Sequence, residues 1–311
     1  MCAGMYAGRA MLKAVVLERG FPGGELLNTE LIEDYPGFES VLGHELAEKF
    51  HTHAAKFGAE FKTSVTIETV KRRDDGTFVT TADNGDQYLS PAVIVTAGGT
   101  PVKLGIPGEL EYAGKGVSYC AICDGAFFRG HTIAVVGGGD AATEEADFLT
   151  RYAEKVYLIH RRDQLRSSKI LQKRLFENPK IEMIWDTAVE SAVGDENGLM
   201  KTLKLQNLRT GERRDLAATG LFIFVGFRPN TGIIADHITH DDMGYIVTDT
   251  NMQTSIRGLF AAGDLRSQLT RQVTTAVGDA TTAAIAAEKY LKLLKDGTPE
   301  GPIAGAGGYT S

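Results

Sequence analysis

The chain has few cysteines, no surplus of basic residues and no long apolar run. Three cysteines among 311 residues are too few for the disulfide framework of a small secreted protein. The formal net charge of -7 disfavours nucleic acid or an anionic membrane as a main partner, because both select for excess Lys and Arg. No stretch of about 18 apolar residues is present, so no transmembrane helix is expected. We therefore expect a cytoplasmic protein with neither a nucleic-acid nor a membrane partner.

Short apolar strands alternate with helical segments along the chain, which is the pattern of an α/β fold. The predicted strands cover residues 14–17, 92–96, 132–136, 156–159, 221–225 and 258–262. The predicted helices include 1–11 and an alanine-rich segment at 272–294. A helix of small residues followed by a strand occurs at 3–17 and again at 141–159. This weak repeat predicts two nucleotide-binding units of similar construction.

A glycine-rich turn lies between a predicted strand and a predicted helix. The sequence GGGDAA at 137–142 has the form GxGxxA and follows strand 132–136. Glycines let the backbone turn tightly and approach a pyrophosphate, and the helix N-terminus offers unpaired N–H groups to phosphate oxygens. The candidate dinucleotide-binding residues of this turn are Gly137, Gly139, Asp140, Ala141 and Ala142.

Basic residues follow the next strand, where a dinucleotide fold contacts the adenosine ribose. They are His160, Arg161, Arg162 and, further along, Arg166. An acid at this place binds the ribose 2′-hydroxyl of NAD, whereas guanidinium groups suit a 2′-phosphate. A solvated basic loop is the alternative. The position after a GxGxxA turn favours a nucleotide site and NADPH over NADH.

A second kind of chemistry is indicated by Cys120-Ala121-Ile122-Cys123-Asp124. Two intervening residues let one turn bring the sulfur atoms within disulfide distance, and a helix N-terminus there lowers a thiol pKa. Asp124 is placed to accept or release a proton as a thiolate forms, or to cap the turn. A zinc site is the alternative, but Cys2 is the only other cysteine and the histidines lack ligand spacing. We predict a redox pair and no metal.

Taken together, these motifs resemble those of the low-molecular-weight thioredoxin reductases. The resemblance is carried in order by GGELLNTELIEDYPGF at 23–38, CAICDG at 120–125, GGGDAA, HRRDQLR at 160–166 and the segment AAGDLRSQLTRQVTTAVGDATTAA at 261–284. It implies two Rossmann-like three-layer domains, the NADPH domain inserted into a discontinuous FAD domain. The implied boundaries are 1–103 and 230–311 for the FAD domain and 104–229 for the NADPH domain with the cysteine pair.

The resemblance also implies an activity, namely an NADPH-dependent thioredoxin-disulfide reductase that acts as a homodimer. Hydride would pass from NADPH through FAD to the Cys120–Cys123 disulfide and then to thioredoxin or a similar small dithiol protein. Segments 103–116 and 227–231 are the expected hinges for rotation of the NADPH domain. Two alternatives stay open: a reductase of another carrier (glutaredoxin-like or peroxiredoxin), and a flavin-deficient NADPH-binding redox protein.

Site residues are carried over from the resemblance position by position. Cys120 corresponds to the thiol that attacks the substrate disulfide, Cys123 to the sulfur that faces the flavin, and Asp124 to the neighbouring acid. Glu18 corresponds to the acid on the FAD adenosine ribose. The other implied cofactor-binding residues are Gly23, Gly24, Glu25, Leu26, Thr29, Asp34, Ala97, Gly98, Gly226, Gly263, Asp264, Arg271, Gln272 and Val273.

Some positions depart from the pattern of these reductases. The first strand and its GxGxxG turn are lacking, so we expect that roughly 12–18 residues are missing through a truncated start, rather than that FAD binding has been lost. Glu25 stands where Gln is usual and Asp34 where Asn is usual, so the flavin surroundings are expected to differ. Asp279 stands where Gly is frequent in the alanine-rich helix, and we expect it on a solvated turn. Cys2 is expected to be a small helix residue without a redox role.

Overall fold

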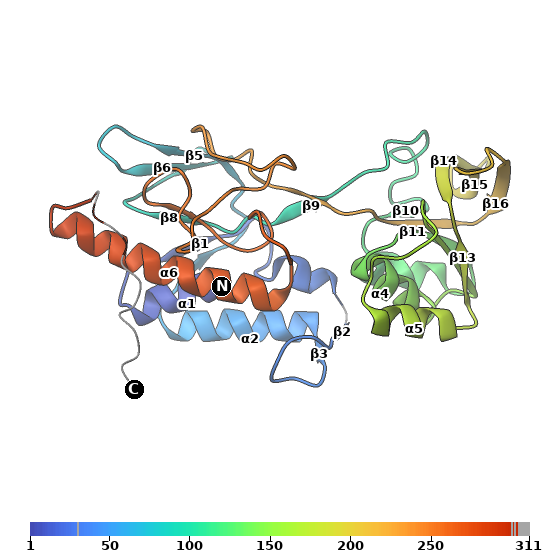
Figure 1. Cartoon of the computed structure of the whole chain (residues 1–311), viewed down its shortest axis with the longest axis horizontal. Helices are drawn as coiled ribbons and strands as arrows, with labels where there is room; N and C mark the ends of the chain where they lie inside the picture. The colour runs from blue at the N-terminus through green and yellow to red at the C-terminus, as the bar shows by residue number, and fades with distance from the viewer. Residues whose placement is uncertain (30, 300, 302, 304–311) are drawn as a thin grey trace. The chain divides into compact units, whose positions relative to one another are not determined.

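The computed structural model describes residues 1–29, 31–299, 301 and 303. The chain divides into two compact units, one formed by Met1–Thr100 with Arg228–Ser311 and the other by Pro101–Phe227. The two crossings between them run through strands β9 (Gly99–Pro101) and β18 (Phe227–Pro229), which pair with each other. Figure 1 shows the two units and this paired connection. Which cofactor each unit binds stays a prediction.

The inserted unit contains a five-stranded sheet in which every neighbouring pair of strands is parallel. Its strand order is β10 (Val117–Ser118), β17 (Gly220–Phe224), β11 (Thr132–Gly137), β12 (Lys155–Ile159) and β13 (Ile181–Ile184). The strands predicted at 132–136, 156–159 and 221–225 are confirmed to within one residue at each end. A parallel sheet is buried on both faces, which explains the continuous apolar runs in these strands.

Two other layers cover this sheet. Helices α4 (Asp140–Leu149) and α5 (Lys169–Glu177) pack on one face, where Ile133 and Val135 of β11 belong to their core. The antiparallel strands β14 (Thr187–Gly194), β15 (Met200–Asn207) and β16 (Arg213–Ala217) cover the other face, where Ala134 and Val136 belong to the core. Alternate residues of β11 thus serve opposite layers, as the two-residue period of a strand requires. The short helices α3 (Ala121–Asp124) and η2 (Gly125–Phe128) precede β11.

The discontinuous unit is built from pairs of strands, a three-stranded sheet and helices of different lengths. β1 (Val15–Leu17) pairs in parallel with β4 (Glu60–Lys62), and β8 (Val93–Val95) pairs in parallel with β19 (Leu259–Ala261). The strands β5 (Ile67–Arg72), β6 (Phe78–Ala82) and β7 (Gln87–Ser90) form an antiparallel sheet, and β2 (Leu31–Ile32) pairs with β3 (Val41–Leu42). The helices are α1 (Cys2–Arg9), η1 (Gly24–Asn28), α2 (Gly43–Lys56) and α6 (Val273–Lys295).

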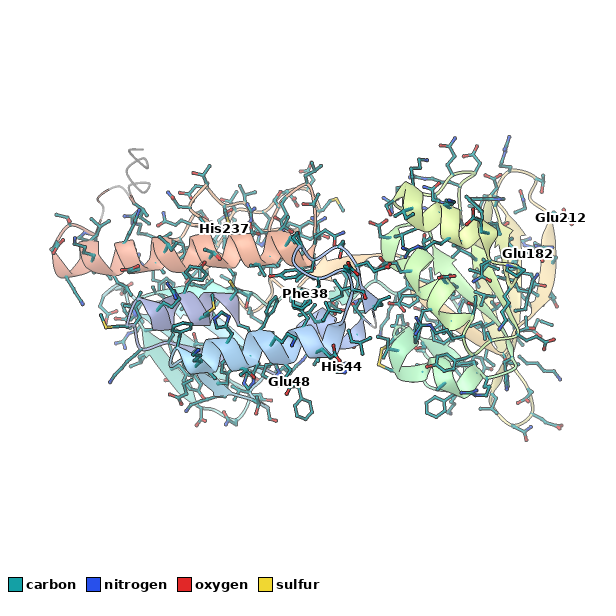
Figure 2. The ribbon with its side chains drawn as sticks, turned by 90° about the horizontal axis from the view of Figure 1, so that it is seen from below. Phe38, His44, Glu48, Glu182, Glu212 and His237 are labelled. Carbon is teal, nitrogen blue, oxygen red and sulfur yellow. A yellow bond between two sulfur atoms is a disulfide. The ribbon has the colours of Figure 1, made fainter. Side chains whose placement is uncertain are left out.

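The core of this unit explains the composition of α6. Its small residues let the helix lie close to β19, so Ala283 and Ala287 pack with Phe260 and the fully buried Tyr290. Figure 1 shows α1, α2 and α6 side by side. In Figure 2 the labelled His44 lies on the exposed side of α2. The α/β class predicted from sequence is confirmed.

Within the described part of the chain, no helix combines the length and the apolarity that crossing a membrane requires.

Candidate functional site

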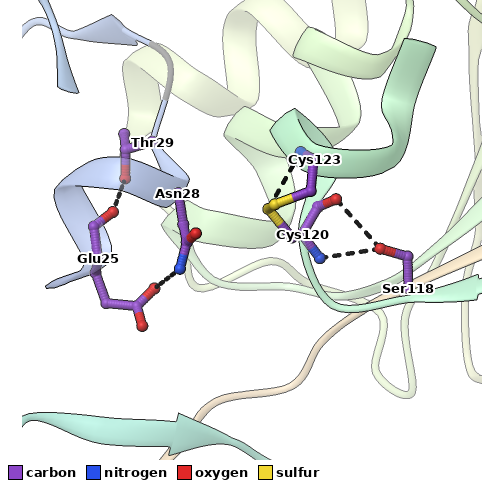
Figure 3. Close-up of a disulfide and its surroundings, with 6 residues drawn as sticks. All are labelled: Glu25, Asn28, Thr29, Ser118, Cys120 and Cys123. Carbon is purple, nitrogen blue, oxygen red and sulfur yellow. Dashed lines mark hydrogen bonds between the residues drawn. A yellow bond between two sulfur atoms is a disulfide. The ribbon is translucent and has the colours of Figure 1, made fainter. Parts of the chain in front are cut away.

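The cysteine pair predicted from sequence forms a disulfide. Cys120 and Cys123 are bonded, with their Cα atoms 5.3 Å apart. Cys120 is the N-cap of α3, and its Sγ accepts a hydrogen bond from the Cys123 backbone N–H at 3.2 Å. Ser118 holds the backbone of Cys120, since its Oγ accepts from the Cys120 N–H at 3.1 Å and donates to the Cys120 carbonyl at 3.2 Å (Figure 3). Hydrogen bonds aimed at Sγ favour the thiolate once the disulfide is reduced.

The glycine turn ends β11 and opens α4, as the motif predicts. A Cβ on Gly138 would lie 2.2 Å from the ring of His160, and one on Gly137 would lie 2.4 Å from the Phe224 carbonyl oxygen. His160 is 6% exposed, and its Nδ1 lies 2.7 Å from the Gly137 carbonyl oxygen. The imidazole is therefore buried against the turn and supports it. Arg161 and Arg162, in contrast, are exposed.

We expect Gly138→Ala to destabilise the protein by roughly 2 kcal/mol, because the added methyl group overpacks a rigid, buried ring. Gly139→Ala is the matched control: no atom lies within 4 Å of its Cβ position and its φ is -99°. Urea unfolding of both variants measures the difference. His160→Ala should relieve the clash, so the double variant should lose less stability than the two single losses added. Equal stability of the Gly138 and Gly139 variants would contradict this account of the turn.

Hydrogen bonds join the glycine turn to the arginine loop. The Asp140 Oδ1 accepts from the Ser168 N–H at 2.6 Å, and the Gly138 carbonyl accepts from the Arg166 N–H at 2.7 Å. The guanidinium-bearing residues Arg161, Arg162 and Arg166 are exposed. A dinucleotide with a 2′-phosphate needs hydrogen-bond donors for both its pyrophosphate and its 2′-phosphate. The backbone N–H groups at the start of α4 and the guanidinium groups of the arginine loop are such donors, and the two hydrogen bonds hold that loop against the turn. The residues present therefore fit NADPH, with Asp140 organising the loop.

The turn at Gly263 is held by an ion pair that the sequence analysis missed. Asp279 is 8% exposed, so the expectation of a solvated turn is wrong. Its carboxylate accepts from Arg266 Nε at 3.1 Å, from an Arg266 terminal nitrogen at 3.0 Å and from the Gly263 N–H at 3.1 Å. The Gln268 side chain closes the turn by donating to the Gly263 carbonyl at 3.1 Å. Asp279 thus fixes the backbone next to Asp264.

Replacing Asp279 by Ala is expected to cost roughly 3 kcal/mol, because Arg266 would be left partly buried without its counter-ion. The side chain of Asp279 is 9% exposed and that of Arg266 is 16% exposed. Asp279→Asn, which keeps an acceptor for the Gly263 N–H, should lose less. Chemical unfolding of the protein without added cofactors gives the comparison, with the exposed Asp242→Ala as control. If Asp279→Ala lowered the free energy of unfolding no more than Asp242→Ala, the Arg266–Asp279 ion pair would contribute nothing to stability.

Charges gather around Asp264 and the start of α6. Desolvation raises the pKa of Asp264, Arg271 opposes the shift and Asp279 adds to it. Desolvation also raises the pKa of Glu25; the hydrogen bond from Asn28 at 3.3 Å opposes it, and Asp264 adds to it (Figure 3). The guanidinium of Arg271 stacks 3.8 Å above the ring of Tyr245. The charge of Asp264 thus adds to the raised pKa of Glu25. A Gln at position 25 would carry no charge to be affected by Asp264.

Helix α6 begins at Val273. Gln272 is its N-cap and forms a reciprocal capping box with Thr275. A capped helix end concentrates N–H donors and positive potential at one point. Gly263 adopts φ +81°, a conformation that favours glycine. These features fit the carbonyl and phosphate groups of a flavin dinucleotide.

The remaining predicted cofactor-binding residues lie in several segments of the discontinuous unit, except Gly226, which belongs to the inserted unit. Glu18 follows β1 and accepts from the Gly20 N–H at 3.0 Å. Thr29 donates to the Glu25 carbonyl at 3.0 Å. Gly226 lies at the end of the inserted unit with φ +119°. Gly23 and Gly24 lie at the start of η1, and Leu26 of η1 is buried in the core. Asp34 is exposed, and Ala97 and Gly98 follow β8, where the Ala97 carbonyl accepts from the Asn230 side chain at 2.8 Å.

A disulfide between Cys120 and Cys123, in the same unit as a glycine turn that joins a parallel strand to a helix, is the arrangement of a nucleotide-dependent disulfide oxidoreductase. The model of the family described as pyridine nucleotide-disulphide oxidoreductase matches residues 1–280. The chain belongs to this family and, within it, to the low-molecular-weight thioredoxin reductases. The family predicted from the sequence motifs is thereby confirmed.

Relatives support this placement over nearly the whole chain. A thioredoxin reductase of Bacillus subtilis is 43% identical over 296 residues, which are 95% of this chain and 92% of the relative. One from Listeria monocytogenes is 44% identical with the same coverage. The crystal structure of Lactococcus lactis thioredoxin reductase superposes with a TM-score of 0.89 at 41% identity, covering 93% of this chain and 94% of that one.

Proposed function

We propose that the chain is an NADPH-dependent flavoprotein that reduces the disulfide of thioredoxin. The observation that carries the proposal is the Cys120–Cys123 disulfide at the N-terminus of α3, in the same unit as a supported glycine turn and exposed arginines. Relatives named as thioredoxin reductases, similar over 95% of the chain, support the choice of substrate.

The inserted unit is assigned to NADPH. The start of α4 holds the pyrophosphate, Arg161 and Arg162 hold the 2′-phosphate, and Asp140 keeps their loop against the turn. When bound, NADPH supplies a hydride and FAD conveys its two electrons to the disulfide. The discontinuous unit is assigned to FAD, with Asp264 and the N-terminus of α6 as contacts of the cofactor.

The cysteines then perform two successive exchanges. Two electrons and two protons convert the Cys120–Cys123 disulfide into two thiols, with Asp124 beside them to exchange a proton. The thiolate of Cys120 attacks one sulfur of the substrate disulfide and releases the other as a thiolate. Cys123 attacks the resulting mixed disulfide, which frees the reduced substrate and restores the original bond. The hydrogen bond from the Cys123 N–H to Cys120 Sγ stabilises the attacking thiolate.

The test is NADPH consumption by the purified protein supplied with FAD and oxidised thioredoxin. Reduced thioredoxin should appear in equal amounts to the NADPH consumed, since each transfer moves two electrons. Replacing thioredoxin by an oxidised glutaredoxin or peroxiredoxin tests the other carriers. NADPH consumption with no thiol formed on any carrier would reject the proposed function.

We further propose that the enzyme works as a homodimer in the cytoplasm. The support is the resemblance of nearly the whole chain to thioredoxin reductases of this size. Light scattering on the protein as it elutes from a size-exclusion column gives its molar mass directly. A mass of one chain across the concentration range used for activity would reject the dimer.

A further inference from the structure

A carboxylate outside the redox motif is buried beside it. Glu109 is 1% exposed and lies in the chain that leads from Pro101 to the cysteine pair. We propose that Glu109 is a positioning residue for Cys120 and acts through the hydroxyl group of Tyr119. The proposal rests on the proposed function only for the role given to Cys120.

Four donors converge on Glu109. One carboxylate oxygen accepts from the Leu104 N–H at 2.9 Å and from the Tyr119 hydroxyl at 2.6 Å. The other accepts from the Gly105 N–H at 2.6 Å and from the Ile106 N–H at 3.3 Å. Burial alone would raise the pKa of Glu109, but these hydrogen bonds outweigh it and lower the pKa. The lowered pKa keeps the buried carboxylate ionised at neutral pH, and the four hydrogen bonds stabilise its charge.

The segment that contains Glu109 is fixed to the body of its unit. The Pro107 carbonyl accepts from the Ala192 N–H of β14 at 3.0 Å. Gly108 has φ +83°, and a Cβ there would lie 2.1 Å from the Ala192 carbonyl oxygen. The segment 107–108 thus lies in close contact with β14, so a shift of the adjacent Glu109 would also require β14 to move. This makes Glu109 a fixed point and argues against a hinge within residues 104–109.

The hydrogen bond of the Tyr119 hydroxyl to Glu109 links the redox motif to this fixed segment. Tyr119 immediately precedes Cys120, and desolvation together with the hydrogen bond to Glu109 raises the pKa of its phenol. Ser118, on the other side of Tyr119, is anchored in β10 and binds the backbone of Cys120 at both its N–H and its carbonyl group. Cys120 is therefore held at the N-cap of α3 by two neighbours that are themselves fixed. Loss of either anchor should let its Sγ leave the Cys123 N–H.

The experiment measures the reactivity of Cys120 in the fully reduced chain. Iodoacetamide alkylation is followed over a range of pH, and mass spectrometry separates Cys120 from Cys123. Tyr119→Phe keeps the three backbone hydrogen bonds of Glu109 and removes only the link to Cys120. We expect alkylation of Cys120 at neutral pH to slow about fivefold, with the midpoint of its pH profile raised, because the thiolate loses its hydrogen bond.

Two further variants complete the design. Tyr112→Phe is the matched control, since Tyr112 lies in the same segment and packs against the core, whereas the tyrosine hydroxyl that donates to Glu109 is that of Tyr119. Glu109→Gln should slow alkylation at least as much as Tyr119→Phe, and the double variant no more than Glu109→Gln alone. If Glu109→Gln fails to fold, Tyr119→Phe still decides the question.

An unchanged pH profile for Tyr119→Phe, with only the thermal midpoint lowered, would overturn the proposal and leave Glu109 a purely structural residue. Alkylation requires no NADPH, FAD or thioredoxin. A protein that failed to reduce thioredoxin could therefore still show the effect, so failure of the proposed function and failure of this inference give different results.

Discussion

Replacing either cysteine of the disulfide by Ser is expected to lower NADPH-dependent reduction of thioredoxin at least about a thousandfold, because each sulfur has a separate, indispensable step. Cys120 forms the mixed disulfide and Cys123 resolves it. Consumption of the first equivalent of NADPH by the flavin-loaded protein should persist in both variants, because hydride entry precedes the disulfide. The measurement compares steady-state thioredoxin reduction with a single-turnover record of the same protein.

The two variants should differ in what accumulates. Cys123→Ser keeps the attacking thiolate, so it should trap oxidised thioredoxin as a covalent complex visible on a non-reducing gel. Cys120→Ser should trap much less. Cys2→Ser is the matched control, because Cys2 lies in α1 with its Sγ against the Val277 carbonyl and Thr281. Retained thioredoxin reduction in both active-site variants would reject the assigned roles.

Removing the two exposed arginines should change the nucleotide preference. We expect Arg161→Ala with Arg162→Ala to raise KM for NADPH about a hundredfold, since each guanidinium contributes roughly 1.5 kcal/mol through charge-assisted hydrogen bonds to the 2′-phosphate. KM for NADH should hardly change, because NADH has a hydroxyl group at this place. The ratio of kcat/KM for the two nucleotides is the quantity to measure.

A control separates specific contact from general electrostatics. Arg213→Ala removes one positive charge from β16, where Arg213 pairs with Glu190 at 2.8 Å on the opposite layer of the same unit. It should leave the preference unchanged at physiological ionic strength, because screening weakens the effect of distant charges. An equal loss for NADPH and NADH in the double variant would mean that the arginines act elsewhere than on the 2′-phosphate.

Local rules predicted the elements that carry the chemistry. The strand at 132–136 could be predicted because both of its faces are buried, which requires a continuous apolar run. The turn after it could be predicted because close neighbours leave no room for a side chain at Gly137 or Gly138. The Cys120–Cys123 bond was predictable because the two residues are close in sequence, so a single turn brings the sulfur atoms together.

Hydrogen bonds and ion pairs of side chains in loops were not predictable in the same way. Asp279 was expected in solvent because a carboxylate in a helix usually lies there, yet it pairs with Arg266 across a turn. Arg266 and Asp279 both lie in the segment 261–284, and opposite charges there were the available signal. The role of Glu109 was not predicted, because its hydrogen bonds to the Tyr119 hydroxyl and to the N–H groups of residues 104–106 depend on the conformation of an irregular loop, which no sequence motif specifies.

The most direct test of the central claim is a count of protein thiols after reduction by NADPH without thioredoxin. The account predicts that the anaerobic, FAD-loaded protein gains two alkylatable thiols per chain, mapped to Cys120 and Cys123, for each NADPH oxidised. If NADPH were oxidised while both sulfur atoms stayed joined, electrons would leave by another route and the account would be contradicted.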